Sequence, residues 1–527
     1  MWIDKKSRRG FLKTAGAGVA CALAWPDAGF SMSDSASAAE LSVTAFGARG
    51  DGQALDTAAI NKAIEAAAAA GGAAVFFPAG KYLCHSIHLK SNITLSLSPG
   101  AAIVAADSSP GTSYDPAESN QPWEAYQDFG HNHWHNSLIW GEGLENVAIT
   151  GPGLIWGKGL SRGWGAGPKA EDPGVGNKTI ALKNCRNVLL RDFSILHGGH
   201  FGILATGVDD ITIDNLKIDT NRDGMDVDCC RNVHISNCSV NSPWDDGICL
   251  KSSYALGYAR ATELVTITGC MVSGGFEEGS LLDGTFKPLD AGSKAWRTGR
   301  IKFGTESNGG FKNITVSDCV FESCHGLALE SEDGALLEDI AISNLTMRDI
   351  VAGPIFLRLG ARMRGPRGVP VGALRRVAIS NVVCSNAAGS MCSIISGVPG
   401  HAIEDLRLSD ILIEHQGGGS RPASVALPEN ERDYPDPDMF GPTPAQGFFI
   451  RHVNGIEMSG IRVLARQPDS RPAFVLSDVQ HADLSHISAP AAPRGAVYAL
   501  EDVKDFRLSA SPPAPDTQLE KAEKREI

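Results

Sequence analysis

Three aspartates recur at the spacing of a sequence repeat and could form one site. Asp245 and Asp246 follow Asp223 by 22 and 23 positions. Carboxylates held close together repel one another, so at least one is expected to have a raised pKa and to stay protonated. A carboxylic acid beside a carboxylate can hydrolyse a glycosidic bond with inversion, with a water held between groups about 6.5–9.5 Å apart. A calcium site and simple turn aspartates are alternative interpretations of the same residues.

The elements that must position these aspartates are short hexads that alternate apolar and polar residues. Residues 211–216, 233–238, 265–270 and 314–319 are examples, and others run from 147 to 487. Such alternation is typical of a half-buried strand, and the Asn, Asp or Gly near its end predicts a left-handed turn. The shortest spacings, 22 and 23 residues, match one coil of a parallel β-helix. A leucine-rich solenoid is disfavoured because its L-x-x-L-x-L pattern and its helices are missing.

Counting from the hexads predicts which side chains stack on successive coils. The twelfth residue after Val188, Ile211, Val233 and Val265 is respectively His200, Asp223, Asp245 and Glu277. Residues at equal phase lie about 4.8 Å apart from rung to rung. His200 and Glu277 are therefore predicted substrate contacts in the column of the aspartates, with a structural turn histidine as the alternative for His200.

The predicted fold is all-β: a right-handed, single-stranded parallel β-helix forming a catalytic domain over residues 40–510. A helical run over residues 58–70 is expected to cap its first coil. The polar, charged residues 511–527 are expected to be a disordered tail. Several of the 12 cysteines fill a hexad slot that Leu or Val fills elsewhere, which indicates buried free thiols rather than a disulfide framework.

The first residues predict export and the composition excludes some partners. Arg8 and Arg9 precede a weakly apolar stretch and an Ala-Ser-Ala site before Ala39, so residues 1–38 are interpreted as a twin-arginine signal to the periplasm or the exterior. No later segment has about 18 consecutive apolar residues, so no membrane span is expected. The net charge of −13 argues against nucleic acid as a partner. The expected partner is a carbohydrate, and the expected state is a monomer.

Several motifs resemble those of glycoside hydrolase family 28, the polygalacturonase family. Residues 221–226 resemble the family's N-T-D-G-x-D motif, and residues 245–252 resemble D-D-x-I-x-x-K-S. The resemblance covers about residues 41 to 400. It implies that Asp245 is the general acid and that Asp223 and Asp246 activate the water, without metal or organic cofactor. Asn221 and Lys251, within these motifs, become candidate substrate contacts.

The family's G-H-G and R-I-K motifs do not line up. The letters R-I-K occur at Arg300 to Lys302, but the place of that segment before Ile314 corresponds better to the strand after G-H-G, and the R-I-K position falls at residues 328–330, ending in Glu330. Either the sugar at this subsite is neutral, which Glu330 would suit, or another cationic pair binds its carboxylate. Arg300 with Lys302, and Arg358 with Arg362, are the two candidate pairs.

Three further positions have alternative interpretations. His325 precedes the R-I-K position and could replace the missing histidine. Trp244 could stack on a sugar or simply pack. Residues 131–135, with three alternate histidines around Trp134, could bind a metal. Because no carboxylate partner is evident nearby, the segment is instead predicted to be a loop of the substrate cleft.

The sequence thus predicts an inverting glycoside hydrolase acting on a pectin-like or other uronic-acid-containing poly- or oligosaccharide. A polysaccharide lyase on the same fold would instead need a base near the uronate α-proton and a cation to stabilise the developing charge. A non-catalytic carbohydrate-binding β-helix is the third possibility. If a change of Asp245 abolishes turnover and leaves the fold intact, the protein is an enzyme and not a non-catalytic binding protein.

Overall fold

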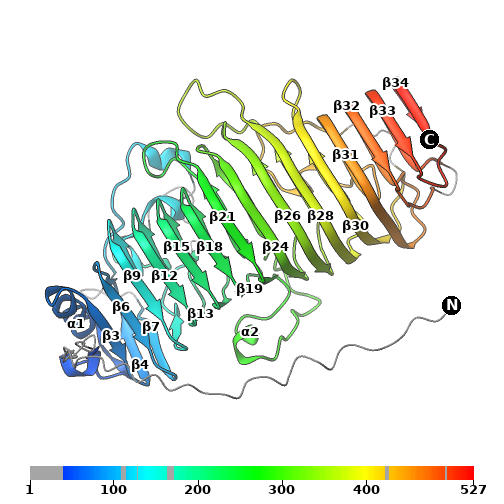
Figure 1. The fold of residues 1–527 in the computed structure, drawn as a ribbon. Coiled ribbons are helices and arrows are strands. Elements are labelled where there is room, and N and C mark those ends of the chain that lie inside the picture. The colour runs from blue at the N-terminus through cyan, green and yellow to red at the C-terminus, as the bar shows by residue number, and fades with distance from the viewer. Residues whose placement is uncertain (1–39, 108–113, 128, 163–170, 422–426, 493–494) are drawn as a thin grey trace, which may run out of the picture. The chain divides into compact units, whose positions relative to one another are not determined.

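Three parallel sheets, stacked rung on rung, make up the described part of the chain (Figure 1). The computed structural model describes residues 40–107, 114–127, 129–162, 171–421, 427–492 and 495–527. Successive coils extend these sheets with parallel strands, so the predicted right-handed parallel β-helix is confirmed. The predicted export signal, residues 1–38, lies outside the described residues.

The sheet that contains the hexads, here called the hexad sheet, runs through all coils. Its strands are β1 (Glu40–Ser42), β3 (Ala73–Phe77), β6 (Ile93–Leu97), β9 (Glu145–Thr150), β12 (Arg186–Arg191), β15 (Asp209–Asp214), β18 (Arg231–Ser236), β21 (Thr262–Thr268), β24 (Phe311–Glu322), β26 (Leu336–Arg348), β28 (Ala373–Ala387), β30 (Ile403–Gly417), β31 (Phe448–Gln467), β32 (Phe474–Ser485), β33 (Tyr498–Ser509) and β34 (Thr517–Glu526).

The second sheet, here called the site sheet, carries the predicted site residues. Its strands are β5 (Ile87–His88), β8 (Ser137–Glu142), β11 (Lys178–Lys183), β14 (Phe201–Thr206), β17 (Asp223–Asp228), β20 (Ile248–Ser252), β23 (Ile301–Ser307), β25 (Leu327–Ser331), β27 (Ile355–Leu359) and β29 (Ser393–Ser396). The starts of β31, β32 and β33 continue it.

The third sheet is built from short strands that connect the other two. They are β2 (Asp51–Leu55), β4 (Gly80–Cys84), β7 (Ala101–Ala105), β10 (Leu154–Trp156), β13 (Ser194–Leu196), β16 (Lys217–Asp219), β19 (Ser239–Asn241) and β22 (Met271–Ser273). The described helices are α1 (Thr57–Ala69), α2 (Ser280–Asp283) and the 3-10 turns η1 (Val43–Phe46), η2 (Trp123–Tyr126), η3 (Phe129–Asn132) and η4 (Pro437–Phe440).

The hexads fold as their alternation predicts. Ile211 and Ile213 of β15 are fully buried, whereas the polar Thr212 between them points to the other face of the sheet and is half-buried. Asn237 ends its hexad in the left-handed conformation, with φ 56°, and its side-chain amide donates to Asp214 Oδ1 of the previous coil at 2.8 Å. Cys238 fills the predicted core slot. The eleven cysteines of the described residues are buried and free, as expected of a core slot.

Both ends of the described β-helix are covered. Helix α1 confirms the predicted capping helix, and its apolar residues Ile60 and Ile64 are buried. The prediction of a disordered tail was wrong, because Thr517–Glu526 form β34, antiparallel to β33. Leu519 and Ala522 pack against the core while charged residues face outward. This strand therefore covers the edge of the last sheet and presents a charged edge, which discourages pairing with another chain. Within the described residues no helix is long and apolar enough to cross a membrane.

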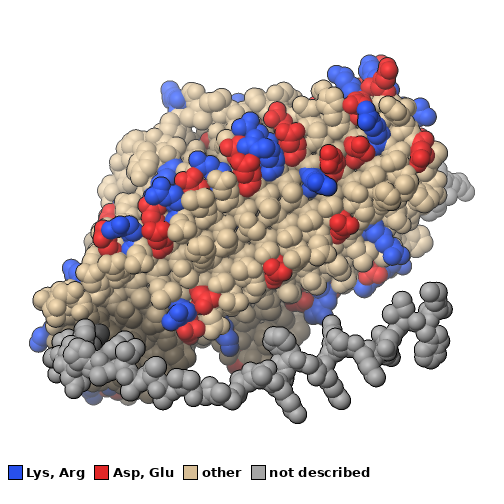
Figure 2. Space-filling view, in the orientation of Figure 1, with Lys and Arg blue, Asp and Glu red and all other residues tan. Residues whose placement is uncertain are grey.

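Charged side chains of both signs lie mixed along the rim of the hexad sheet, and its centre is mostly uncharged (Figure 2). Ion pairs such as Arg376 with Asp339, at 2.7 Å, account for this mixing. The face in this view therefore lacks the single-sign basic surface that nucleic acid would need. The site lies on another sheet, at its outward face.

Candidate active site

The three predicted carboxylates meet on adjacent rungs of the site sheet. Asp223 begins β17, and Asp245 and Asp246 lie in the turn that leads into β20, which pairs with β17. Each carboxylate has an oxygen within 4.8 Å of one in each of the others. The Asp246 N–H donates to Asp223 Oδ1 at 3.0 Å and to Asp245 Oδ1 at 3.1 Å. These oxygens lie closer together than the about 6.5–9.5 Å that separates the two carboxyl groups of an inverting pair.

Asp246 is held as an anion. Burial acts to raise its pKa, but Lys302 and Arg300 outweigh burial and lower the pKa below its ordinary value. Arg300 Nε donates to Asp246 Oδ1 at 2.8 Å, and Lys302 Nζ lies 3.2 Å from Oδ2. Asp246 therefore has the charge of a general base.

The pKa of Asp223 is shifted in the opposite direction. Burial raises its pKa well above the ordinary value, and the charges of Asp245 and Asp226 add to this effect, while Lys251 opposes it. In the substrate-free protein the shared proton therefore favours Asp223. The opposite pKa shifts of Asp223 and Asp246 agree with the expected combination of a protonated and an ionised carboxyl.

Asp245 is bound by an arginine that sequence reasoning missed. Arg222 donates to Asp245 Oδ2 through Nη2 at 2.7 Å and through Nε at 3.1 Å. Its Nη1 lies 3.3 Å from His200 Nδ1. Burial lowers the pKa of His200 well below its ordinary value, so its neutral ring can accept this bond. The signal was the Arg at the position where the family motif has Thr.

Arg300 and Lys302 lie on the rung directly after the aspartate pair. Ile301 pairs with Ile248, and Lys302 pairs with Ala328 of the next rung. Glu330 Oε1 lies 3.8 Å from Arg300 Nη2, and its Oε2 lies 3.6 Å from Lys302 Nζ. Burial raises the pKa of Glu330 to about 7, against the influence of both cations. Arg300 and Lys302 are therefore already paired with the acidic side chains of Asp246 and Glu330.

The alternative cationic pair does not reach the site. Arg358 Nη1 donates to Ser396 Oγ at 2.9 Å, and its Nη2 donates to the Glu429 carbonyl at 2.9 Å. Arg362 binds Asp333. Arg358 therefore anchors the connection before β31, and of the two candidate pairs Arg300 and Lys302 face the aspartates.

Residues 427–441, which precede β31, form a loop that closes one side of the site and was not foreseen. Asp436 Oδ2 accepts from Arg300 Nη2 at 3.0 Å, and the Tyr434 hydroxyl accepts from Lys302 Nζ at 3.1 Å. Arg300 and His325 lower the pKa of Asp436 in spite of its burial. His325 Nδ1 lies 3.8 Å from Asp436 Oδ2, so this histidine faces the loop and not the three aspartates.

A histidine from the segment 131–135 does approach the aspartates. His131 Nε2 lies 3.1 Å from Asp226 Oδ2, and both groups cluster with Asp223 within 4.8 Å. His135 Nε2 lies 3.0 Å from Glu142 Oε2. The expectation that these histidines lack carboxylate partners was wrong, because His131 meets Asp226 of another coil and His135 meets Glu142 of the adjoining strand β8. Trp134 is fully buried, which also excludes it from a substrate cleft.

The remaining predicted contacts divide into buried and peripheral residues. Asn221 is buried, and Lys251 is buried with its Nζ 3.1 Å from Glu306 Oε2. Trp244 packs edge-on against Trp296, with ring centroids 6.2 Å apart. Glu277 does not continue the aspartate column, because residues 274–299 bulge out between β22 and β23 and Glu277 pairs there with Lys287 at 2.8 Å.

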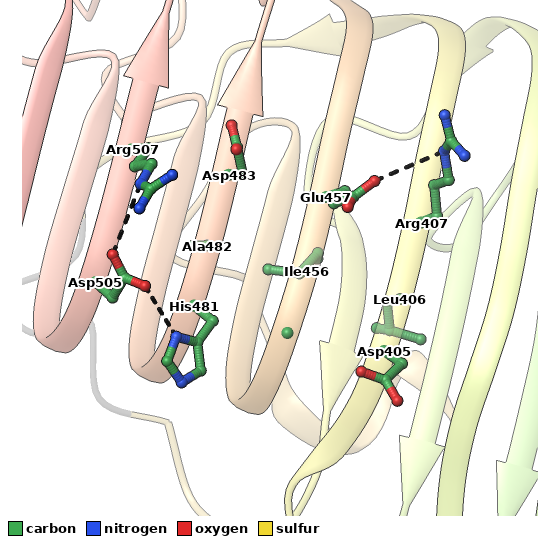
Figure 3. A pocket seen from close by; sticks show the side chains of 11 residues that line it. Asp405, Leu406, Arg407, Ile456, Glu457, His481, Ala482, Asp483, Asp505 and Arg507 are labelled. Carbon is green, nitrogen blue, oxygen red and sulfur yellow. Dashed lines mark hydrogen bonds and ion pairs between the residues drawn. The ribbon is translucent and has the colours of Figure 1, made fainter.

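A groove on the hexad sheet offers a contrast (Figure 3). Its Asp505 pairs with His481 at 2.9 Å and with Arg507 at 3.8 Å, and Arg407 lies 3.8 Å from Glu457. These groups are largely exposed, and their charges are screened by water. The groove lacks the buried, mutually repelling carboxyls that hydrolysis needs.

Fold and site together define a parallel β-helix hydrolase, and comparison with known proteins shows which families it resembles. The model for glycosyl hydrolases family 28 matches residues 119–278, and the model for rhamnogalacturonase A/epimerase, pectate lyase-like proteins matches residues 41–153. The chain is similar to glycoside hydrolase family 28 over these residues and is a glycoside hydrolase.

Individual relatives are distant. A probable polygalacturonase of Vitis vinifera is 25% identical over 395 residues, which cover 71% of this chain and 74% of the relative. An exo-poly-alpha-D-galacturonosidase of Dickeya chrysanthemi is 25% identical over 213 residues, 40% of this chain and 33% of the relative.

Two solved structures share the fold. A hyperthermoactive exopolygalacturonase of Thermotoga maritima has 18% identity and a TM-score of 0.59, with 93% of this chain and 94% of that chain covered. A family 28 exopolygalacturonase of Yersinia enterocolitica has 17% identity and a TM-score of 0.61, with 84% and 78% covered.

Proposed function

We propose that this hydrolase cleaves the glycosidic bonds of a galacturonan-type, uronic-acid-containing glycan with inversion of configuration. The observation that carries the proposal is the cluster of Asp223, Asp245 and Asp246, in which the pKa of Asp223 is raised and the pKa of Asp246 is lowered. The names of the relatives support the choice of substrate.

In the proposed reaction Asp245 protonates the leaving oxygen. It is the most accessible of the three carboxyls, with a side chain 19% exposed, whereas Asp246 is 3% exposed. Asp246 and Asp223 hold and deprotonate the attacking water on the other face of the sugar. Lys302 and Arg300 keep Asp246 ionised for this task.

Attack at a chain end is favoured by the surroundings of the site. The loop 427–441 lies against Arg300 and Lys302 through Asp436 and Tyr434, so it closes one side of the aspartate cluster. A closed side accommodates the terminal sugar of a chain better than its interior.

The test is turnover of a glycan panel that includes polygalacturonate and its oligomers. We expect new reducing ends, no ultraviolet-absorbing unsaturated product, and an inverted anomer in the first NMR spectra. Asp245→Asn should lose about 10²–10⁴-fold in kcat. Asp405→Asn, in the exposed groove of Figure 3, is the matched control and should keep full activity. An unsaturated product would overturn the proposal in favour of a lyase.

We also propose export through the twin-arginine pathway, on the strength of Arg8-Arg9, the apolar run and the Ala-Ser-Ala site. Fractionation of a producing strain should find the protein outside the cytoplasm, and Arg8→Lys combined with Arg9→Lys should retain it inside. The monomeric state stays a prediction, which sedimentation would test.

A further inference from the structure

The proposed acid is paired with a cation in the substrate-free protein. Arg222 contacts Asp245 Oδ2 with two nitrogens, at 2.7 and 3.1 Å. A carboxylate in such a charge-assisted pair is stabilised as an anion. An anion cannot protonate a leaving oxygen, so the pair has to open before hydrolysis.

Arg222 differs from the other cations around the aspartates. The side chains of Arg300, Lys302 and Lys251 are at most 5% exposed and pair with buried acids. The side chain of Arg222 is 19% exposed, as is that of its partner Asp245. An incoming carboxylate therefore reaches Arg222 with less desolvation than it would need to reach the buried cations.

We propose that Arg222 is the specificity-determining residue of the site: the substrate's uronate carboxylate displaces Asp245 from Arg222, and Asp245 thereby becomes able to act as the acid. This inference rests on the proposed function. Arginine is suited to the exchange, since its planar fork binds either carboxylate in the same geometry.

The proton for Asp245 is already in the cluster. Asp223 has an oxygen within 4.8 Å of one in Asp245 and tends to hold the proton in the substrate-free protein. Once the uronate neutralises Arg222, Asp245 loses its counter-charge and takes the proton from Asp223. One proton moves, the total charge of the two carboxyls is unchanged, and Asp223 becomes the carboxylate that accepts a proton from water. Substrate recognition would thus set both roles at once.

The experiment compares two substrates that differ only at the carboxyl: an oligogalacturonate and its methyl ester. For the unaltered protein we expect kcat/KM to favour the free acid by about tenfold or more, because the ester cannot draw Arg222 away. In Arg222→Gln this preference should fall to about one, because Asp245 is then unpaired before either substrate binds. Arg222→Lys, which keeps the charge without the fork, should give an intermediate preference.

Arg231→Gln is the matched control, since Arg231 pairs with Asp209 on the hexad sheet at 3.6 Å and its side chain is 52% exposed. It should keep the preference for the acid. Equal losses on both substrates in Arg222→Gln, with the preference intact, would give Arg222 a merely structural role and overturn the inference alone. If the unaltered protein cleaves neither substrate, the proposed function fails and the inference with it.

Discussion

The outward face of the site sheet changes character along the β-helix. In the column that faces outward, Asp226, Cys249 and Lys302 occupy three successive rungs. Further along, the same column holds Phe356 and Ile394, which are buried under the loop 427–441 together with Phe440. The first half of this face carries the carboxylates and cations of the site. The second half is an apolar surface on which the loop that closes the site packs.

This difference shows how one repeat supports two tasks. The inward residues of both halves are apolar and interchangeable, so the backbone repeats without regard to function. The outward residues are free to vary because they do not hold the coil together. The catalytic groups therefore lie where the outward column is charged, and the loop 427–441 packs where the column is apolar.

The largest predicted effect comes from neutralising the charged half. Asp246→Asn removes the anion that Arg300 and Lys302 hold, and kcat should fall by about 10²–10⁴-fold with an unchanged circular dichroism spectrum. Ser396→Ala, in the other half, should leave kcat within about twofold. Similar losses in both variants would contradict the division of the face.

The boundary of the two halves should respond to pH. The Glu330 carboxyl has a pKa of about 7 in the folded protein and about 4.5 when unfolded, so the folded state binds the proton more tightly. Its contribution favours folding at low pH and is lost as pH rises from about 4.5 to about 7, by on the order of 3 kcal/mol. Melting curves at both pH values should show that the stability of Glu330→Gln, relative to that of the unaltered protein, is greater at the higher pH. A constant difference would contradict the assignment.

The apolar half should depend on the anchor of its covering loop. Arg451 donates to the carbonyls of Leu427 and Pro428 at 3.0 and 2.9 Å, and its guanidinium lies 4.9 Å from the ring centroid of Phe440. Arg451→Gln should cost about 1–3 kcal/mol of local stability. Faster proteolysis within 427–441 and a raised KM, with kcat less affected, would be the readouts. An unchanged cleavage rate would show that other contacts hold the loop.

The smallest effect is expected where both halves are alike, in the core. Cys238 occupies a slot that Leu or Val fills on other coils, so Cys238→Val should change the free energy of unfolding by less than about 1.5 kcal/mol. Chemical denaturation would measure it, and turnover should be unaffected. A large loss would indicate that the thiol has a specific partner.

The sequence by itself determined the repeat, the capping helix and the meeting of Asp223 with Asp245 and Asp246. Periodicity sufficed for these because a β-helix places residues one coil apart next to one another. Tertiary structure alone decided the partners: Asp436 and Tyr434 on Arg300 and Lys302, and His131 beside Asp226. Their loops lie 95 to 136 positions away in the chain, and no period relates them to the strands they cover. It also decided that residues 517–526 are a strand, since pairing to an open sheet edge outweighed their polar composition.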